Sequence, residues 1–361
     1  MPAPLVAVNG RFLTMTATGV QRYAREILVR IGEALEANMR VIVPPDRVLS
    51  ADSSELSSVE RTERWHGLRG HAWEQVALTR LVRRAHADLL WSPCNWGPVA
   101  VRRQVPVIHD VAPLMYPEYF TPAYRGLARL LTKPLVRRAA TVTTPSSRVR
   151  EELVERFSLP PNRVTVVPPG VGAPFTSVSL EDIGRRDGRY CVHVGAHDSR
   201  KNVDFLLELW PDVHARTGLE LHLAHRRVVT ASRPPALANE SAGIVEHLDP
   251  TDGDLADLYA GALCLLWPSH YEGYGFPLLE AMAAGTPFLA ADVGAAAELA
   301  VDPERQILPL DRSLWVERIE DWSRTGVGGL REESARRARA QTWEASAAQT
   351  ARLLDELAGG A

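Results

Sequence analysis

Lysine is almost absent from this sequence. The 361 residues include 41 lysines and arginines, yet Lys133 and Lys201 are the only lysines. Lysine carries a compact charge on a flexible stem, whereas arginine carries a planar fork, so the two are not interchangeable where geometry is tight. Each remaining lysine is therefore a candidate for a specific role, with chance retention as the alternative for Lys133.

Cysteine is also scarce, and the pattern does not indicate a disulfide framework. Cys94, Cys191 and Cys264 are odd in number, far apart and set in apolar runs, where free cysteine behaves as a small hydrophobe. This usage favours a reducing cytosol. The first residues lack the basic segment of a signal peptide. No stretch approaches the ~20 apolar residues of a membrane span, so we expect a cytoplasmic protein.

Several catalytic signatures are missing. None of the 11 histidines forms a pair backed by cysteine or carboxylate at ligand spacing, so we predict no metal site. There is no G-x-S-x-G turn and no P-loop. The formal net charge of -3 argues against a nucleic-acid partner. We expect no cofactor.

The chain alternates short β-like runs with helical periods, which indicates a parallel α/β protein. Its length suggests two domains of roughly 150 residues each. In the first half, a helix is predicted from Val20 to Ile31 and a loop over residues 50–66. Further helices are predicted around 72–86, 122–138 and 146–156, and strands at 5–8, 41–43, 88–91, 105–109, 140–144 and 164–167.

A polar stretch from Thr176 to Gly188 lacks periodicity and resembles a linker. We therefore predict one domain over residues 1–175 and a second over 176–341. Strands of the second are expected at 190–194, 220–223, 244–247, 262–267 and 287–290. Because open parallel sheets bind ligands at the carboxyl ends of their strands, we expect the site in a cleft between the domains.

A glycine loop lies between the strand at 262–267 and a predicted helix. Pro277 suits the first helical turn and Gly285 suits the C-terminal cap. Backbone N–H groups at such a helix start favour a phosphate. Two carboxylates flank the loop: Glu272, and Glu280, which we expect in the first helical turn facing the cleft, with helix capping as the alternative. The predicted ligand loop consists of Gly273, Tyr274, Gly275 and Phe276.

Arg200 and Lys201 stand together at a second strand-to-helix junction, a few residues after Gly195. Positive charge at a helix start opposes the helix dipole unless an anion compensates. A guanidinium fork beside an ammonium suits a diphosphate. The alternative is a pair of solvated surface charges.

Two further candidates belong to the first domain. His109 ends the apolar strand at 105–109, where a histidine donates hydrogen bonds or shuttles protons. A buried structural histidine is the alternative. Gly19 sits in a small-residue loop that lets backbone approach a ligand, although turn chemistry alone also explains it.

Together these residues resemble the retaining glycosyltransferases of family 4, which have the GT-B fold of two Rossmann-like domains facing across a cleft. The likeness is strongest from Glu272 to Glu280, similar to the family's two-glutamate motif, and extends to residues 18–24, 109–110, 145–147 and 195–202. The C-terminal helix, about 342–361, resembles the family segment that crosses back to complete the first domain. Ala196, where many relatives have arginine, and a missing glycine within Leu223–Arg226 depart from the pattern and leave the nucleobase open.

The resemblance implies a role for each candidate. Arg200 and Lys201 would hold the diphosphate, and the loop amides of Gly273–Phe276 would touch sugar and phosphate. Glu272 would contact donor-sugar hydroxyls, Glu280 the ribose hydroxyls, and His109 the sugar and acceptor side. No metal is implied, since the basic pair and helix dipole stabilise the departing nucleotide.

The resemblance thus implies a retaining, metal-independent hexosyltransferase. It would move a mannose-like or deoxyhexose unit from a nucleotide diphosphate sugar to a glycan or glycolipid hydroxyl in bacterial surface polysaccharide synthesis. The alternatives are sugar-nucleotide epimerisation or hydrolysis on the same fold, and a non-catalytic sugar-nucleotide-binding subunit.

A basic stripe marks the predicted helix 122–138, where basic residues recur every fourth position between leucines. Such a stripe could dock on anionic lipid to reach a lipid-linked acceptor. A solvated helix face is the alternative. The stripe consists of Arg125, Arg129, Lys133 and Arg137.

Overall fold

The computed structural model describes residues 3–16, 18–32, 34–44, 59–61, 68–179, 183, 188–195, 199–225 and 243–360. The chain divides into two compact units. Unit 1 comprises Met1–Gly170 and Thr342–Ala361, and unit 2 comprises Val171–Gln341. The chain therefore passes between units at Gly170, where the sequence analysis placed the boundary at 175. Most of the predicted linker Thr176–Gly188 lies outside the described residues.

Unit 1 contains a five-stranded parallel sheet in the order β3-β2-β1-β4-β5, and a small two-stranded sheet of β6 and β7. The strands are β1 (Leu5–Asn9), β2 (Asn38–Val43), β3 (Val59–Arg61), β4 (Leu89–Ser92), β5 (Gln104–Pro106), β6 (Val142–Thr144) and β7 (Val164–Val166). The adjacent strands β1 and β4 are apolar except for their last residues and are buried on both faces, as in a sheet covered by helices.

The helices of unit 1 follow the predicted periods, with side-chain caps at several starts. Ser146 accepts the N–H of Val149 and Thr121 accepts that of Tyr124. The turns and helices are η1 (Gly10–Thr14), α1 (Gly19–Ile31), α2 (Gly70–Ala72), the π-helical η3 (Trp73–Leu78), α3 (Thr79–Arg84), α4 (Ala112–Met115), η4 (Pro117–Tyr119), α5 (Pro122–Arg138), α6 (Ser147–Phe157), η5 (Pro161–Arg163) and α16 (Trp343–Gly359).

Two predictions for unit 1 need correction. The segment 50–66, predicted as a loop, contains the short edge strand β3, which pairs with β2 through Val41 and Val59; its other residues lie outside the described part. Three residues are too few to show a period, so the sheet alone defines this strand. The strand predicted at 105–109 ends at Pro106, and only Val107 bridges onward to Thr143.

Unit 2 repeats the design of unit 1, with the parallel order β10-β9-β8-β11-β12. Its strands are β8 (Tyr190–Val194), β9 (Glu220–His225), β10 (Ile244–Leu248), β11 (Leu265–Trp267) and β12 (Phe288–Ala290). Its turns and helices are η6 (Ser199–Lys201), α8 (Val203–Thr217), α10 (Asp252–Gly261), α11 (Phe276–Ala283), α12 (Ala296–Leu299), α13 (Pro303–Gln306), α14 (Arg312–Thr325) and α15 (Leu330–Arg339).

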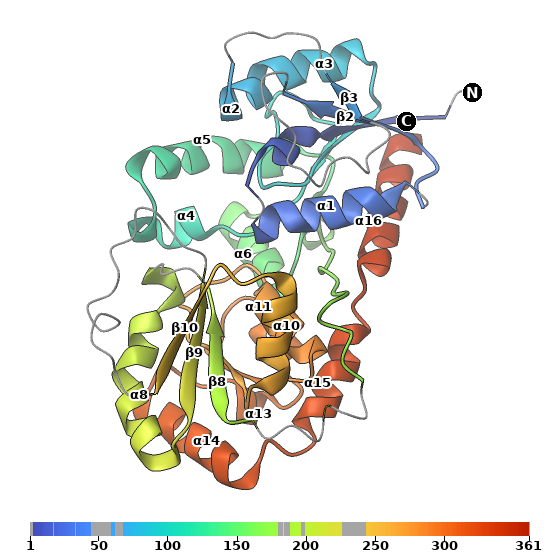
Figure 1. The fold of residues 1–361 in the computed structure, drawn as a ribbon. Helices are drawn as coiled ribbons and strands as arrows, with labels where there is room; N and C mark the ends of the chain where they lie inside the picture. Colours follow the sequence, from blue (N-terminus) through green and yellow to red (C-terminus); the bar gives the residue numbers. More distant parts are fainter. Residues whose placement is uncertain are drawn as a thin grey trace. The chain divides into compact units, whose positions relative to one another are not determined.

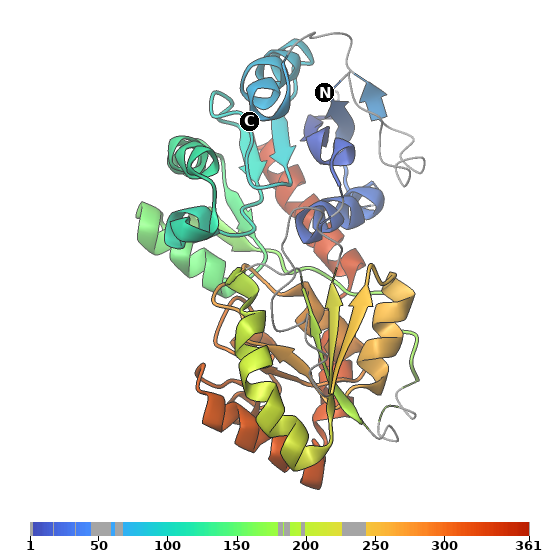
Figure 2. The ribbon, with the colours of Figure 1, turned by 60° about the vertical axis from the view of Figure 1, so that its left-hand side comes forward.

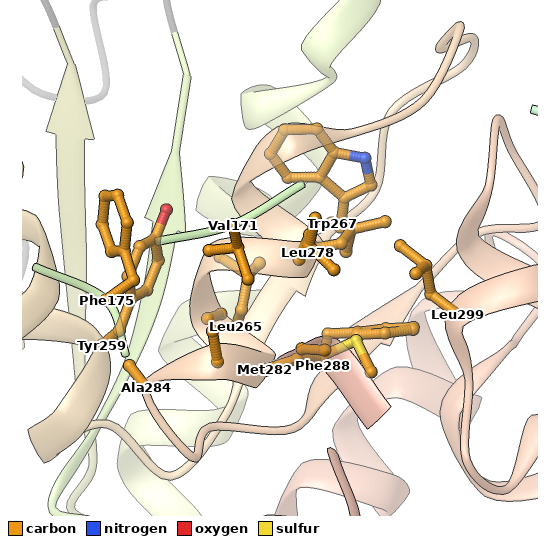
Figure 3. Packing of buried hydrophobic residues seen from close by; sticks show 14 of the residues in the cluster. Val171, Phe175, Tyr259, Leu265, Trp267, Leu278, Met282, Ala284, Phe288 and Leu299 are labelled. Carbon is orange, nitrogen blue, oxygen red and sulfur yellow. The ribbon is translucent and has the colours of Figure 1, made fainter. Parts of the chain in front are cut away.

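Alternate residues of the unit 2 strands enter two separate cores. Leu265 and Trp267 pack with α10 and α11, whereas Cys264 and Leu266 pack with α8 and α14. Figures 1 and 2 show α8 and α10 on opposite faces of this sheet. Figure 3 shows the first of these cores, with Trp267 at one end against Leu278. Because side chains alternate between the two faces of a strand, the position of each residue in the strand determines which core it enters.

The C-terminal helix belongs to unit 1, where α16 packs against α1. Trp343 lies edge-on to Tyr23, with ring centroids 6.1 Å apart, and Ser346 donates to the carbonyl of Pro168. Among the described residues, no helix has the length and apolar character needed to cross a membrane.

Candidate functional site

The basic pair predicted in unit 2 converges on one carboxylate. Lys201 Nζ donates to Glu272 Oε1 at 2.6 Å, and Arg200 Nη1 donates to Glu272 Oε2 at 3.2 Å. The side chains of Arg200 and Lys201 are only 20% and 15% exposed, so the alternative of two solvated surface charges is wrong. The anion that compensates them here is an internal glutamate.

Topology explains why residues so far apart in sequence meet. Strand order runs outward from β8 through β9 in one direction and from β11 through β12 in the other. The order reverses between β8 and β11, and open α/β sheets bind ligands beside the carboxyl ends of strands at such a reversal. Arg200 and Lys201 follow β8, and Glu272 follows β11.

Charge, not burial, decides the protonation state of Glu272. Burial by itself raises the pKa of this carboxyl, but Lys201 and Arg200 outweigh burial and the pKa lies below its ordinary value. Glu272 is therefore an anion at neutral pH. Two cations against one anion leave these three side chains with a surplus positive charge, which favours a further anion.

Backbone contacts tie the two loops together. The N–H of His270 donates to the carbonyl of Arg200 at 2.8 Å, and Arg200 Nη1 donates to the carbonyl of Tyr271 at 2.8 Å. Asn202 Nδ2 donates to the carbonyl of Pro268 at 3.1 Å from a left-handed conformation with φ of 55°. The basic pair is thus held in a fixed place next to the glycine loop.

The glycine loop ends where α11 begins, as the sequence predicts. Gly275 is the N-cap residue with φ of 104°, and having no side chain it caps none of the first N–H groups itself. Pro277 lies in the first turn, and Phe276 is half-buried. Tyr274 is buried, and its hydroxyl donates to Gln341 Oε1 at 2.7 Å. Such a helix start suits an anion.

Gly294 packs closely against the glycine loop. A Cβ on Gly294 would lie 2.8 Å from the carbonyl oxygen of Tyr274 and 2.9 Å from Glu272 Cβ, and φ there is 56°. The N–H of Ala295 donates to the same carbonyl at 3.0 Å. Half-buried Gly273 lies within the segment so supported.

Glu280 lies one residue beyond the first helical turn, in which the sequence analysis placed it. α11 begins at Phe276, so Glu280 lies beyond the first turn, where it does not cap the helix. It is buried, and the hydroxyl of Tyr259 donates to Glu280 Oε2 at 3.4 Å. The difference of one residue arises because α11 begins at Phe276, directly before the proline that suits a first helical position.

Gly195 and one residue that the sequence analysis missed complete the surroundings of Lys201. Gly195 follows β8, and a Cβ there would lie 3.6 Å from Cγ and Cδ of Lys201. Trp267, the last residue of β11, places its ring centroid 4.4 Å from Lys201 Nζ. A tryptophan at the end of an apolar strand is typical of a buried core residue, so the sequence did not predict this contact. Residues 196–198, part of the predicted phosphate motif, lie outside the described residues, as does Arg226.

In unit 1, His109 is buried in uncharged surroundings. Its Nε2–H donates to the carbonyl of Pro93 at 2.8 Å, and its backbone N–H donates to Asn95 Oδ1. Tyr23 lies edge-on to the imidazole, with centroids 4.9 Å apart. Burial lowers the pKa of His109 to about 4, against a partial rise from the Pro93 contact. At neutral pH the ring is thus uncharged, with Nδ1 as its acceptor nitrogen.

Gly19 is the exposed first residue of α1. Thr18 is the N-cap, and Gln21 reaches back to it in a capping box. Among the described residues, no three His, Cys, Asp or Glu side chains gather into a group that could hold a metal ion.

Two family models match this chain. The model for "Glycosyltransferase Family 4" matches residues 17–173, and that for "Glycosyl transferases group 1" matches residues 188–322. The chain belongs to the family 4 type of glycosyltransferases.

Curated and solved relatives agree with this class. The chain is 24% identical over 273 residues to the O-antigen chain mannosyltransferase RfbU of Salmonella typhimurium, covering 74% of each chain. Sucrose-phosphate synthase from Thermosynechococcus elongatus has the same fold, with a TM-score of 0.75 at 17% identity, covering 99% of this chain and 100% of that one. Anabaena HepE in complex with UDP and glucose gives a TM-score of 0.69 at 16% identity, covering 98% and 99%. The fold is GT-B.

Proposed function

We propose that this glycosyltransferase transfers a hexosyl unit, mannose-like or deoxyhexose, from a nucleotide diphosphate sugar to a hydroxyl of a glycan or glycolipid in bacterial surface polysaccharide synthesis. The convergence of Arg200 and Lys201 on Glu272 beside the start of α11 carries the proposal. The name of the Salmonella relative, an O-antigen chain mannosyltransferase, supports both sugar and process.

The leaving diphosphate sets the chemical demand on this site. Arg200 and Lys201 would bind its oxygens, and the amides of the loop Gly273–Phe276 would add hydrogen bonds at the helix start. Fixed positive charge of this kind stabilises charge that develops as the bond to the sugar breaks. We propose that no metal is required.

Diphosphate and Glu272 would compete for the same two cations. Glu272 is held by Arg200 and Lys201, and a bound diphosphate would take over these contacts. The carboxylate would then be free to accept hydrogen bonds from donor-sugar hydroxyls. Glu280, held by Tyr259, would accept from the ribose hydroxyls.

The proposed reaction retains configuration at the anomeric carbon. The bond from this carbon to the phosphate oxygen breaks, the acceptor oxygen bonds to the same face, and the acceptor proton passes to the leaving phosphate oxygen. His109, assigned to the sugar and acceptor side by family resemblance, would accept a hydroxyl hydrogen bond at Nδ1. Its pKa of about 4 speaks against proton shuttling at neutral pH.

The proposal is tested by thermal-shift titration with UDP, GDP, ADP and dTDP, with and without EDTA. A ligand that binds only the native state raises the melting temperature. We expect a selective shift with one nucleotide that EDTA leaves unchanged. No shift with any of them refutes the diphosphate site. Sugar release without acceptor would favour hydrolysis, and a changed donor sugar would favour epimerisation.

We further propose that α5 contacts anionic membrane surface. Its inner face is buried, while Arg129, Lys133 and Leu130 are exposed, Leu130 to 69%. Arg137 donates to the carbonyl of Phe157, so its charge is partly engaged. Cosedimentation with anionic vesicles should exceed that with zwitterionic vesicles and fall with salt. The double variant Arg129→Glu, Lys133→Glu should lose it; equal binding of wild type and variant contradicts the proposal.

A further inference from the structure

The ammonium of Lys201 rests on an aromatic ring as well as on a carboxylate. Its Nζ lies 4.4 Å from the ring centroid of Trp267 and 2.6 Å from Glu272 Oε1. A cation within about 6 Å of a ring face is attracted by the ring quadrupole, and tryptophan attracts it most strongly. Two partners of different chemistry thus hold one cation.

The ring is rigid, whereas the lysine stem is flexible. Trp267 is fully buried and packs with Leu278 and the other members of its core (Figure 3). The stem of Lys201 passes over Gly195, where a Cβ would come within 3.6 Å. A lysine stem has many rotamers and loses entropy when it is fixed. Contact with the rigid ring therefore limits the positions open to the ammonium.

We propose that Trp267 is a positioning residue that holds Lys201 ready for the diphosphate. The inference rests on the proposed function, in which the diphosphate replaces Glu272 as the partner of Lys201. A second carboxylate would neutralise the charge of the Lys201 ammonium. The indole ring positions the ammonium without neutralising it, so the full positive charge can act on the diphosphate. When Glu272 turns to the sugar, the ring keeps Lys201 in place.

Trp322 provides a matched control. It lies in the same unit on α14, is likewise fully buried, and its indole N–H, like that of Trp267, finds no acceptor among the described residues. No cation lies over its ring in the described part of the chain. Substitution of either tryptophan removes similar core volume, so a difference between the two variants excludes a general loss of core volume as its cause.

The first test needs no ligand. Because Lys133 and Lys201 are the only lysines, protein labelled with 13C-lysine gives two sets of side-chain NMR signals, and Lys201→Met assigns them. We expect the ε-methylene protons of Lys201 to be shifted upfield by the indole ring current. The shift should shrink in Trp267→Phe, vanish in Trp267→Leu and persist in Trp322→Leu. An unchanged Lys201 signal in Trp267→Leu overturns the inference.

The second test measures affinity for the nucleoside diphosphate that stabilises the wild type. Trp267→Leu should raise Kd about tenfold, Trp267→Phe less, and Trp322→Leu not at all. In a Lys201→Met background, Trp267→Leu should cost no further affinity. An equal loss in both backgrounds means that Trp267 supports only the fold, and overturns the inference.

The two tests separate this inference from the proposed function. A wild type that binds none of the four nucleoside diphosphates overturns the proposed function and the role of the ring with it. A wild type that binds one of them, with affinity unchanged in Trp267→Leu, overturns the positioning role alone.

Discussion

Each unit buries a glutamate among basic side chains, and the two clusters differ in the partners of the carboxylate. In unit 1, Glu74 accepts from Asn9 Nδ2 at 2.9 Å, Arg11 Nε at 3.0 Å and His71 Nδ1 at 2.6 Å. In unit 2, Glu272 faces two permanent cations on its two oxygens. Glu74 lies on the helical turn η3, and Glu272 lies in a loop.

The comparison shows how one topology serves two purposes. In both units an arginine of the cluster follows the central strand, Arg11 after β1 and Arg200 after β8, and the sheet order reverses beside that strand. In the Glu74 cluster one guanidinium, from Arg11, faces the carboxylate, and the other partners are the amide of Asn9 and the imidazole of His71. In the Glu272 cluster two cations face one carboxylate next to a glycine loop, an arrangement that suits an anionic ligand. The predictions below test this difference.

The largest effect is expected from Lys201→Ala. Loss of the ammonium should weaken nucleoside diphosphate binding on the order of 100-fold or more and abolish transfer, because charge-assisted contacts to a desolvated anion are among the strongest in proteins. Lys133→Ala, at the exposed second lysine, is the control and should match wild type in nucleoside diphosphate affinity. Calorimetric titration measures the nucleoside diphosphate affinity of the two variants. Unchanged affinity in Lys201→Ala would contradict the assignment of Lys201 to the diphosphate.

Glu272→Gln should separate turnover from binding. Turnover should fall about 100-fold, the cost of a lost transition-state contact, while nucleoside diphosphate affinity stays the same or rises, because the internal competitor is neutral. Glu74→Gln, its counterpart in unit 1, should cost on the order of 1–3 kcal/mol of stability without changing that affinity. Parallel loss of turnover and affinity in Glu272→Gln contradicts the division of roles.

Acid pH should distinguish His109 from Glu272. The pKa of His109 is lowered to about 4 from an unfolded value near 6.5, so its stabilisation is complete above pH 6.5 and is lost as pH falls toward 4. The loss amounts to roughly 3 kcal/mol. The depressed pKa of Glu272 acts only at lower pH, below the usual carboxyl range near 4.3.

Urea unfolding midpoints at pH 7 and pH 5 measure the histidine contribution. His109→Gln should flatten the decline between these values, since no proton is then taken up preferentially by the unfolded chain. An equally steep decline in this variant would show that another group titrates there.

The smallest effects are expected from two glycines. Gly294→Ala meets the carbonyl of Tyr274 at 2.8 Å and Glu272 Cβ at 2.9 Å, so it should cost about 1–2 kcal/mol and weaken diphosphate binding. Gly19→Ala, exposed at the start of α1, should change stability by no more than about 0.5 kcal/mol. The melting temperatures of the two variants measure these effects. Equal shifts would contradict the role of Gly294 in supporting the glycine loop.

Local sequence was sufficient for elements with a strong period or a clear turn. Strand β8 coincides with the predicted 190–194, and α11 starts at the glycine loop with proline in its first turn, because alternation, apolar runs and capping residues act over a few positions. The edge strand β3 could not be predicted, since three residues carry no period and only pairing with β2 defines them. Glu280 differs from its predicted position by one residue only, because α11 begins at Phe276, directly before Pro277.

The sequence by itself determined the class of fold and the residue types of the site: a basic pair after one strand, and two glutamates around a glycine loop after another. Only the tertiary structure decided that these cations bind Glu272, that Trp267 lies against Lys201, and that His109 is neutral with Nε2 bound to a carbonyl. The physical reason is distance along the chain. Lys201 and Glu272 are 71 residues apart, and the pairing of β8 with β11 brings them together.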